Sequence, residues 1–474
     1  MSRAPTAAFR PAAAALLAAL VCTVPPTAPA TAGDPWSERE LGERLDIEAL
    51  DLSRPDHRDA LIARGEHLFS AKFTTLDGAG RPMATQAIVP TKRKRPVADA
   101  FQRMAGPDAN ACASCHMDPV PGGAGPFTAN AFVTEGFESA DFDSLDPQFS
   151  NERGTNHVFG SGLIELLARE MTADLQAQRR AALNEARRTG EPVRADLATK
   201  GVSFGRLTAL PDGMVDLTGL DGVDTDLVLR PFSQKGVMTS LRQFTVNAMN
   251  HHHGMQADER FGARWTGEAD FDEDGVAGEL TDADITALVI WQATRPPPGR
   301  RTGLAPDWQA MAERGETLFA ETGCASCHIP ALPLDSAVFA DPSPYDMAGT
   351  LRAGERDVLS LDISAGLARD AQGRLLVPLF GDLKRHRIAD ERRDTLGNEL
   401  LSQRFVDRDV FQTAELWGVA STAPYGHRGD LTTLDEAIRA HAGAATESRA
   451  RYEALEDNER EAIIAFLKTL VIAP

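Results

Sequence analysis

The sequence predicts a mainly α-helical fold made of two similar units with a further region between them. One five-residue pattern, Cys-Ala-Ser-Cys-His, occurs twice, at residues 112–116 and 324–328. A similar stretch precedes each copy, Arg-Gly-Glu-His-Leu-Phe at 64–69 and Arg-Gly-Glu-Thr-Leu-Phe at 314–319. Near the C-terminus an apolar stripe has the spacing of one helix face, at Ile463, Phe466, Leu467 and Leu470. A motif that recurs with the helix before it indicates two copies of one structural unit.

The chain divides at a proline-rich stretch. Arg-Pro-Pro-Pro-Gly at 295–299 ends the apolar helix before it, because proline lacks the N–H group that a helix interior needs. We therefore expect one unit over residues 33–150, an intervening region over 151–298 and a second unit over 299–474.

Helices and a short hairpin are expected in the intervening region. A long amphipathic helix is predicted from Leu163 to Arg188, because its apolar residues share one face and Gly190 follows it. Residues 207–217 place Pro-Asp-Gly between two alternating runs, which is typical of a β-hairpin.

The repeated motif has the chemistry of covalent haem attachment. Two thiols three positions apart can add to the two vinyl groups of one haem, and the next residue is an imidazole placed to ligate the iron. The alternatives are a structural zinc site built from both pairs, a disulfide in each loop, or a thioredoxin-like redox pair. A zinc site does not require His directly after the second Cys, and the pairs lie about 200 residues apart. We therefore predict two covalently bound haems c, with the following attachment and iron-ligating residues: Cys112, Cys115 and His116 in the first motif, and Cys324, Cys327 and His328 in the second.

The N-terminus and the charge suggest where the protein works. Residues 1–32 resemble a signal peptide: Arg3 and Arg10 precede an apolar stretch that is too short to span a bilayer, and Ala-Thr-Ala at 30–32 follows it. We expect export to the periplasm, where haem c is attached. With 69 acidic and 49 basic residues the net charge is −20, which argues against nucleic acid or an anionic membrane as a partner. A small redox protein with a basic patch would complement it.

The chain resembles a known family, the di-haem oxidoreductases (thiol oxidoreductase-like), which are distant relatives of bacterial di-haem cytochrome c peroxidases and of rubber oxygenase. The segments that carry the resemblance are 106–116, 160–165, 323–330, 379–386 and 415–427. The resemblance implies two cytochrome c-like domains, each holding one haem c, with a helical and short-hairpin insertion between them.

The same resemblance suggests the second ligand of the C-terminal haem. In the peroxidases a His-Asp-Gly segment is followed, fourteen residues later, by an axial ligand that is commonly Met. Here His427-Arg428-Gly429 stands at that position, and fourteen residues after His427 comes His441. A His328/His441 pair would lower the reduction potential relative to a His/Met pair, because imidazole stabilises ferric iron more than a thioether does. The alternative is that His441 is only a cation at the end of a helix.

A histidine cluster is the candidate pocket of the N-terminal haem. In related chains the corresponding segment lines the distal side of the peroxidatic haem. In this sequence it contains His251, His252 and His253. A histidine there can ligate iron or move protons, and we take His252 and His253 as the catalytic candidates. Three adjacent histidines cannot all point at one iron, so at least one is structural or faces solvent. Glu165 is a further distal candidate, whose alternative role is to cap or pair within its helix.

One acidic segment predicts a possible calcium site. Asp270, Asp272 and Asp274 alternate and Gly275 follows, as in the first half of an EF-hand loop. Position twelve is Thr281, with Glu279 and Asp282 on either side, so the closing ligand differs from that pattern, and we take Glu279 as the candidate. The alternative is an acidic surface turn.

Taken together, these features predict a periplasmic di-haem c oxidoreductase. The leading hypothesis is a peroxidase-like enzyme whose N-terminal haem reacts with a small oxidant or substrate while the C-terminal haem relays electrons. The alternatives are an electron-transfer cytochrome without substrate chemistry and a rubber-oxygenase-like dioxygenase. The other histidines and tryptophans have no specific role from the sequence. His57, His67 and His157 have no recognisable partner, and His386 is expected near the C-terminal haem. Any of Trp265, Trp291 and Trp417 could lie between the haems.

Overall fold

A computed structural model of the chain forms the basis of the following description. The residues that it describes are 36–80, 92, 110–130, 152–346, 349–399 and 405–472. The expected signal peptide lies outside them.

The N-terminal lobe is organised around two crossing helices, α1 (Pro55–Ser70) and α7 (Asp282–Ala293). Almost every residue of α7 is buried, and Thr281 caps its first turn. A Cβ atom on Gly65 would overlap the carbonyl oxygen of Ala287, so only glycine allows the two helices to approach so closely. The N-terminal motif therefore lies in a lobe that is closed by a helix from the expected intervening region.

The C-terminal lobe repeats this crossing with α8 (Pro306–Glu321) and α11 (Asp457–Leu467). Gly315 is the counterpart of Gly65, because a Cβ atom there would overlap the carbonyl oxygen of Ala462. Three residues of the predicted apolar stripe, Ile463, Phe466 and Leu467, are buried on this last helix, whereas Leu470 lies beyond its end in the strand Leu470–Val471. The Arg-Gly-Glu repeat in the sequence thus corresponds to one helix crossing, formed twice.

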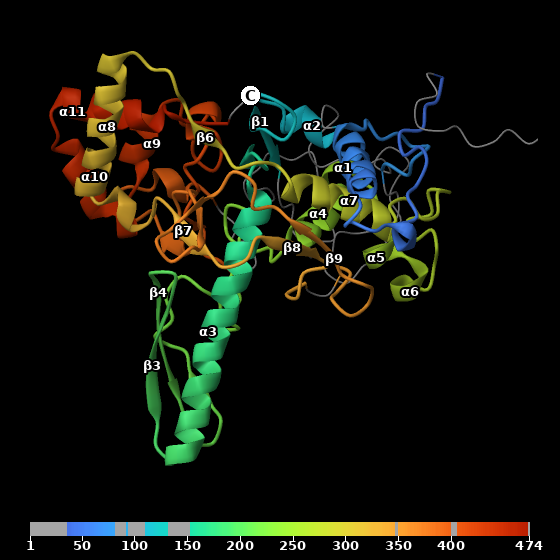
Figure 1. Ribbon diagram of the computed structural model, residues 1–474, viewed down its shortest axis with the longest axis horizontal. Helices are drawn as coiled ribbons and strands as arrows, with labels where there is room; N and C mark the ends of the chain where they lie inside the picture. The colour runs from blue at the N-terminus through green and yellow to red at the C-terminus, as the bar shows by residue number, and fades with distance from the viewer. Residues whose placement is uncertain are drawn as a thin grey trace, which may run out of the picture.

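An arm extends from the region between the two lobes (Figure 1). It consists of α3 (Ser161–Thr189), which confirms the predicted amphipathic helix, and an antiparallel sheet of β3 (Val193–Thr199), β4 (Val202–Ala209) and β5 (Val215–Asp216). The pairing of β4 with β5 confirms the predicted hairpin, and β3 adds a strand in the order β3-β4-β5. Gly190 ends α3 with a positive φ of 75°.

The expectation of a mainly α-helical fold is wrong. Helix covers 37% of the described residues and strand 17%, in several small sheets. Besides the sheet of the arm, the strands are β1 (Gly125–Asn130) with β2 (Glu152–Thr155), β6 (Gly299–Arg300) with β14 (Leu470–Val471), β7 (Leu332–Leu334) with β11 (Leu375–Val377) and β10 (Ala368–Arg369), β8 (Val338–Asp341) with β9 (Leu359–Asp362), and β12 (Arg385–Arg387) with β13 (Val410–Gln412). Strands of two to four residues contain too few positions to show an alternating pattern, so distant pairing rather than local sequence defines them.

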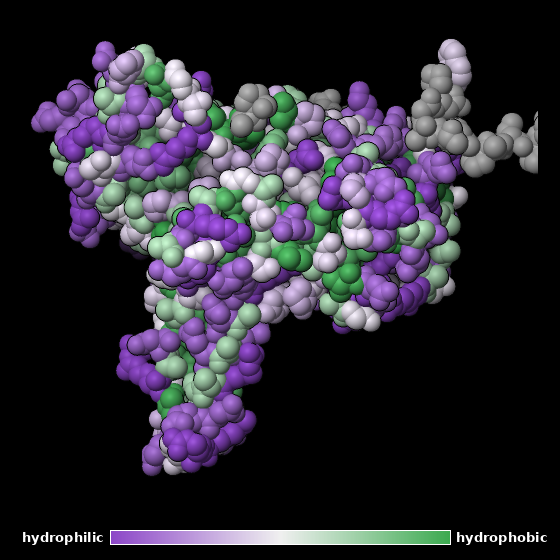
Figure 2. Space-filling model, viewed as in Figure 1, coloured by the Kyte–Doolittle hydropathy of each residue, from purple (hydrophilic) through white to green (hydrophobic). Residues whose placement is uncertain are grey.

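The remaining helices are short. They are α2 (Cys112–Cys115), α4 (Leu241–Ala248), α5 (Asp258–Phe261), α6 (Ala263–Thr266), α9 (Leu434–Ala440) and α10 (Thr446–Glu453). In Figure 2 hydrophilic residues cover much of the C-terminal lobe and the arm on the face that is drawn, in agreement with the acidic composition. Among the described residues, no helix is both long and apolar enough to cross a membrane.

Candidate haem sites

The N-terminal motif forms one helical turn, α2, that presents two free thiols and an imidazole. The N–H of His116 donates to the carbonyl of Cys112 at 2.9 Å, which closes the turn. The ring of His116 packs against Phe69 of α1, with 5.8 Å between centroids. Burial lowers the pKa of His116, which favours the neutral imidazole that binds metal, and raises the pKa of the Cys112 thiol to about 12. This donor set fits a covalently attached haem.

The histidine cluster lies beside this motif. His251, His252 and His253 belong to a π-helical turn, Met249–His253, that continues α4. The Nε2 atom of His253 is 3.4 Å from the Sγ atom of Cys112, and its ring is 5.7 Å from that of Phe73. Single π-helical turns inside helices often mark functional positions. The structure therefore brings His253 to the N-terminal motif, with the ring of His252 a further 6.5 Å away.

Glu165 has structural partners instead. Its carboxylate pairs with Arg169 at 2.5 Å within α3 and accepts the N–H of Leu241, the first residue of α4, at 2.8 Å. Burial nevertheless raises its pKa, because these partners only partly compensate the lost water. The capping and pairing role agrees with these contacts.

The C-terminal motif brings two imidazoles together. The Nδ1–H of His328 donates to the carbonyl of Phe380 at 3.2 Å, and the Nδ1–H of His441 donates to the carbonyl of Ala437 at 2.7 Å. Both rings are thereby held as the tautomer whose Nε2 carries a lone pair. Burial lowers the pKa of His328 to about 4, and the charge of a protonated His441 contributes to this shift. The two rings therefore interact electrostatically. These donors fit a haem iron with two axial imidazoles.

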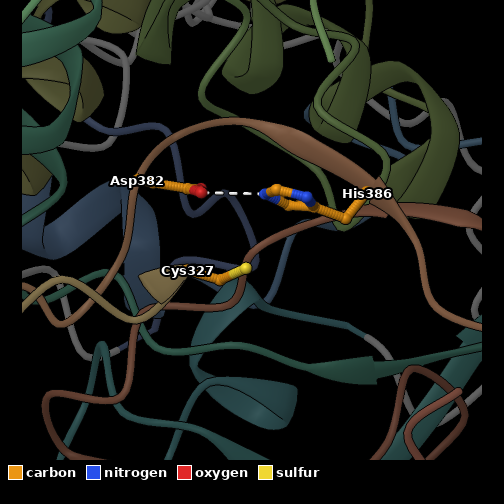
Figure 3. A group of neighbouring side chains, drawn as sticks. All are labelled: Cys327, Asp382 and His386. Atoms are coloured by element: carbon orange, nitrogen blue, oxygen red, sulfur yellow. Dashed lines mark hydrogen bonds and ion pairs between the residues drawn. The ribbon is translucent and has the colours of Figure 1, made fainter. Parts of the chain in front are cut away.

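A third histidine adjoins the same motif (Figure 3). Cys327, Asp382 and His386 place one ligand atom each within 4.8 Å of one another, and the Nε2 atom of His386 lies 2.8 Å from the Oδ2 atom of Asp382. Burial lowers the pKa of His386, but hydrogen bonds to Asp382 and Cys327 outweigh it and raise the pKa to about 9. Three ligands are one fewer than a structural zinc site takes. Attachment of haem makes Cys327 a thioether, after which Asp382 is the acidic partner of His386.

A chain of hydrogen bonds runs from the C-terminal motif to His157, which interacts electrostatically with His116 of the N-terminal motif. The Nε2–H of His157 donates to the carbonyl of Trp417 at 3.1 Å, and the charge of His116 contributes, after burial, to lowering the pKa of His157 to about 4. The N–H of Leu416, the neighbour of Trp417, donates to the carbonyl of Phe380 at 3.4 Å. That carbonyl also accepts the hydrogen bond from His328.

Sequence reasoning gave His157 no partner and left Trp417 as one of three candidates. The His157–Trp417 contact joins residues 260 positions apart. No local pattern carries that information.

The turn before His441 is held by a buried charged cluster. His427 stacks on Phe411 with 4.5 Å between centroids, and burial together with Arg153 and Lys235 lowers its pKa to about 2. Glu399 pairs with both cations, at 3.2 Å from the Nζ atom of Lys235. His427 is therefore a neutral, packed ring that fixes the turn leading to α9.

Three of the predicted acidic residues of the loop bring their carboxylates together. The carboxylates of Asp270, Asp272 and Asp274 lie within 4.8 Å of one another. Glu279 is buried nearby, whereas Thr281 is the N-cap of α7 and has no place in the loop's acidic cluster.

Comparisons with known proteins leave the family open. The chain matches no protein-family model and no curated protein. One similar solved structure is a Kuenenia stuttgartiensis hydrazine synthase, at 16% identity and a TM-score of 0.24 over 45% of this chain and 64% of that one. Another is a MauG-like protein associated with microbial copper homeostasis, at 16% identity and a TM-score of 0.28 over 55% of this chain and 79% of that one. Scores this low support no inference about activity.

Proposed function

We propose that the protein is a di-haem c oxidoreductase with one reactive and one electron-relaying haem. The observation that carries the proposal is the asymmetry of the two motifs. At the C-terminal motif His328 has a second imidazole, His441, as its neighbour, and both rings keep Nε2 for a metal. At the N-terminal motif the neighbour of Cys112 is a histidine cluster whose members can bind or exchange protons.

Each haem c supplies an iron that accepts and returns single electrons. The cysteines hold the haem, and His116 and His328 are the motif imidazoles that ligate its iron. The carbonyl of Phe380 orients His328 by accepting its Nδ1–H. His253 and His252 hold or move protons beside the N-terminal haem, since an imidazole changes its charge near neutral pH.

The contacts between the motifs supply an electron route. From His328 they run through the carbonyl of Phe380 to Leu416 and Trp417, and from the carbonyl of Trp417 to His157 beside His116. Electrons that enter at the C-terminal haem would reach His157 over these hydrogen bonds and the main chain of Leu416 and Trp417, and would cross from His157 to the N-terminal haem through space.

The reaction class that we propose is peroxidase-like reduction of a small oxidant. Reduction of hydrogen peroxide to two water molecules consumes two electrons and two protons; the electrons come from a small donor protein and the protons pass through the histidine cluster. A basic patch on that donor would complement the net charge of −20. Work in the periplasm is part of this proposal, because haem c is attached there.

Two spectroscopic additions test it. Carbon monoxide added to the fully reduced protein should bind only the N-terminal haem, because the other iron holds two imidazoles. Hydrogen peroxide, added to a separate reduced sample without carbon monoxide, should oxidise the protein rapidly. If neither reagent changes the spectrum, both irons are six-coordinate and inert, and the protein is an electron-transfer cytochrome. If dioxygen reacts in place of peroxide, the oxygenase alternative is correct.

A further inference from the structure

Three carboxylates from one loop face one another between α6 and α7. Those of Asp270, Asp272 and Asp274 lie within 4.8 Å of each other. Gly275 follows with a φ of 94°, a left-handed conformation that lets the chain turn around the cluster.

Asp272 is the residue that makes this cluster unusual. Its side chain is 0% exposed, and neither of its oxygens has a hydrogen-bond partner. Asp270, by contrast, accepts the N–H groups of Asp274 and Gly275 at 3.2 and 3.0 Å. A buried carboxylate without donors is costly, and an ion at the cluster would compensate that cost.

Cationic side chains do not fill this role. Within the part of the chain that the structure describes, no Lys, Arg or His forms an ion pair with Asp270, Asp272 or Asp274. Lys92 is close, but it pairs with Glu268 and Glu273 on the outside of the loop.

Glu279 adds a fourth carboxylate on the buried side. It is 2% exposed and interacts electrostatically with Asp272, Asp274 and Asp270. The four groups thus repel one another unless a cation lies among them.

We propose that this loop binds one Ca²⁺ ion through Asp270, Asp272 and Asp274, with Glu279 as the fourth, buried carboxylate. Calcium fits because the donors are all oxygens and a flexible loop can supply the six to eight that it takes, whereas zinc and copper favour imidazole and thiolate. In an EF-hand the closing ligand is a glutamate at position twelve; here it would be Glu279, at position ten.

The ion also links the loop to the histidine cluster, a consequence that rests on the proposed function. The Oε2 atom of Glu279 accepts the N–H of Gln256 at 2.6 Å, and the N–H of Leu280 donates to the carbonyl of Gln256 at 3.2 Å. Gln256 comes three residues after His253. A charge that fixes Glu279 therefore fixes the end of the segment that carries His251 to His253.

The test uses the full-length holoprotein, stripped with EGTA and titrated with CaCl2 in a calorimeter and in thermal melts. Wild type and Glu273→Gln should both bind calcium and melt at higher temperature as its concentration rises, because Glu273 belongs to the same loop but points to Lys92. Asp272→Asn should bind at least about tenfold more weakly. Without calcium it should melt no lower than wild type, since it lacks one buried charge, and this result excludes misfolding as the cause.

The proposal is overturned if wild type shows neither heat nor stabilisation, or if Asp272→Asn responds as wild type does. The link between the calcium loop and the histidine cluster is measured separately. Removal of calcium should change the visible spectrum of the N-terminal haem alone; binding without that change refutes the link and leaves the site. A protein without two haems would refute the proposed function, while its calcium titration would still decide the site.

Discussion

At the scale of single residues, the two motif histidines differ in what faces them. The Nδ1–H groups of His328 and His441 each donate to a backbone carbonyl, which leaves the Nε2 atom of both rings with a lone pair. Backbone carbonyls cannot move independently of the fold, so both rings are oriented before a haem is bound. The neighbour of the N-terminal motif, His253, is instead part of a π-helical turn with two further histidines.

Replacing His441 tests the axial pair. His441→Met should raise the reduction potential of one haem and leave the other nearly unchanged, because a thioether favours the ferrous state. His441→Ala should turn one low-spin haem high-spin. Redox titration and visible spectra measure both effects, with His57→Ala as the control because His57 lies at the start of α1 and contacts the Asp51 backbone. Unchanged spectra in His441→Ala would place the ligand elsewhere.

The His386–Asp382 pair predicts a pH dependence of stability. The pKa of His386 is raised to about 9 in the folded state, from about 6.5 in the unfolded state. The pair therefore contributes fully to folding stability below pH 6.5, and this contribution is lost as the pH rises to about 9. The contribution to stability is at most about 3–4 kcal/mol, at about 1.4 kcal/mol for each pKa unit, and would be smaller with Cys327 as a thioether. Denaturant unfolding from pH 6 to 9.5 should show this decline in wild type and a flatter curve in Asp382→Asn. Parallel curves would assign the decline to other groups.

At the scale of elements, one helix crossing is used twice. Gly65 lies against Ala287 and Gly315 against Ala462, and in both pairs the contact is with a backbone oxygen that cannot move aside. In the N-terminal lobe the crossing positions α1 against the motif turn α2, and in the C-terminal lobe it positions α8, which leads directly into the motif.

Alanine at either glycine should therefore destabilise its own lobe. Gly65→Ala and Gly315→Ala should each cost about 1–3 kcal/mol or more, because a methyl group is forced into a filled contact. Gly299→Ala is the control, since a Cβ atom there meets nothing within 4 Å and the backbone conformation is ordinary. Thermal melts and haem content measure the effect: each variant should lose haem mainly at its own motif. Equal loss at both motifs would mean that the lobes do not behave as separate units.

How much could be predicted from the sequence depends on how local each feature is. The helix from Ser161 to Thr189 and the acidic loop could be predicted because their patterns span a few consecutive turns. The short strands could not, because each is defined by pairing with a distant segment. The site divides in the same way: the motif cysteines and histidines are local, and so is Asp382, four residues before His386, whereas the contacts of His157 with Trp417 and of His386 with Cys327 depend on tertiary structure.

At the scale of the whole molecule, the proposed function requires electron transfer between the two lobes. His157 precedes the arm helix in the chain, and its partner Trp417 comes from the C-terminal segment that also contacts Phe380. Trp417 is 2% exposed and packs against Gly160, whereas His157 is only partly buried. A hydrogen-bonded junction that includes a buried indole is suited to the electron transfer that we propose.

Two substitutions distinguish electron transfer along the main chain from electron transfer through the indole side chain of Trp417. In His157→Ala the link from the carbonyl of Trp417 to His116 is lost, so electron transfer between the haems should slow, while both haems keep their spectra. In Trp417→Phe the carbonyl remains, so the rate should fall less. Trp265→Phe is the control because Trp265 is exposed on α6. Stopped-flow mixing of half-reduced protein with peroxide measures the transfer. A larger loss in Trp417→Phe than in His157→Ala would mean that the indole, rather than the hydrogen-bonded main chain, carries the electron.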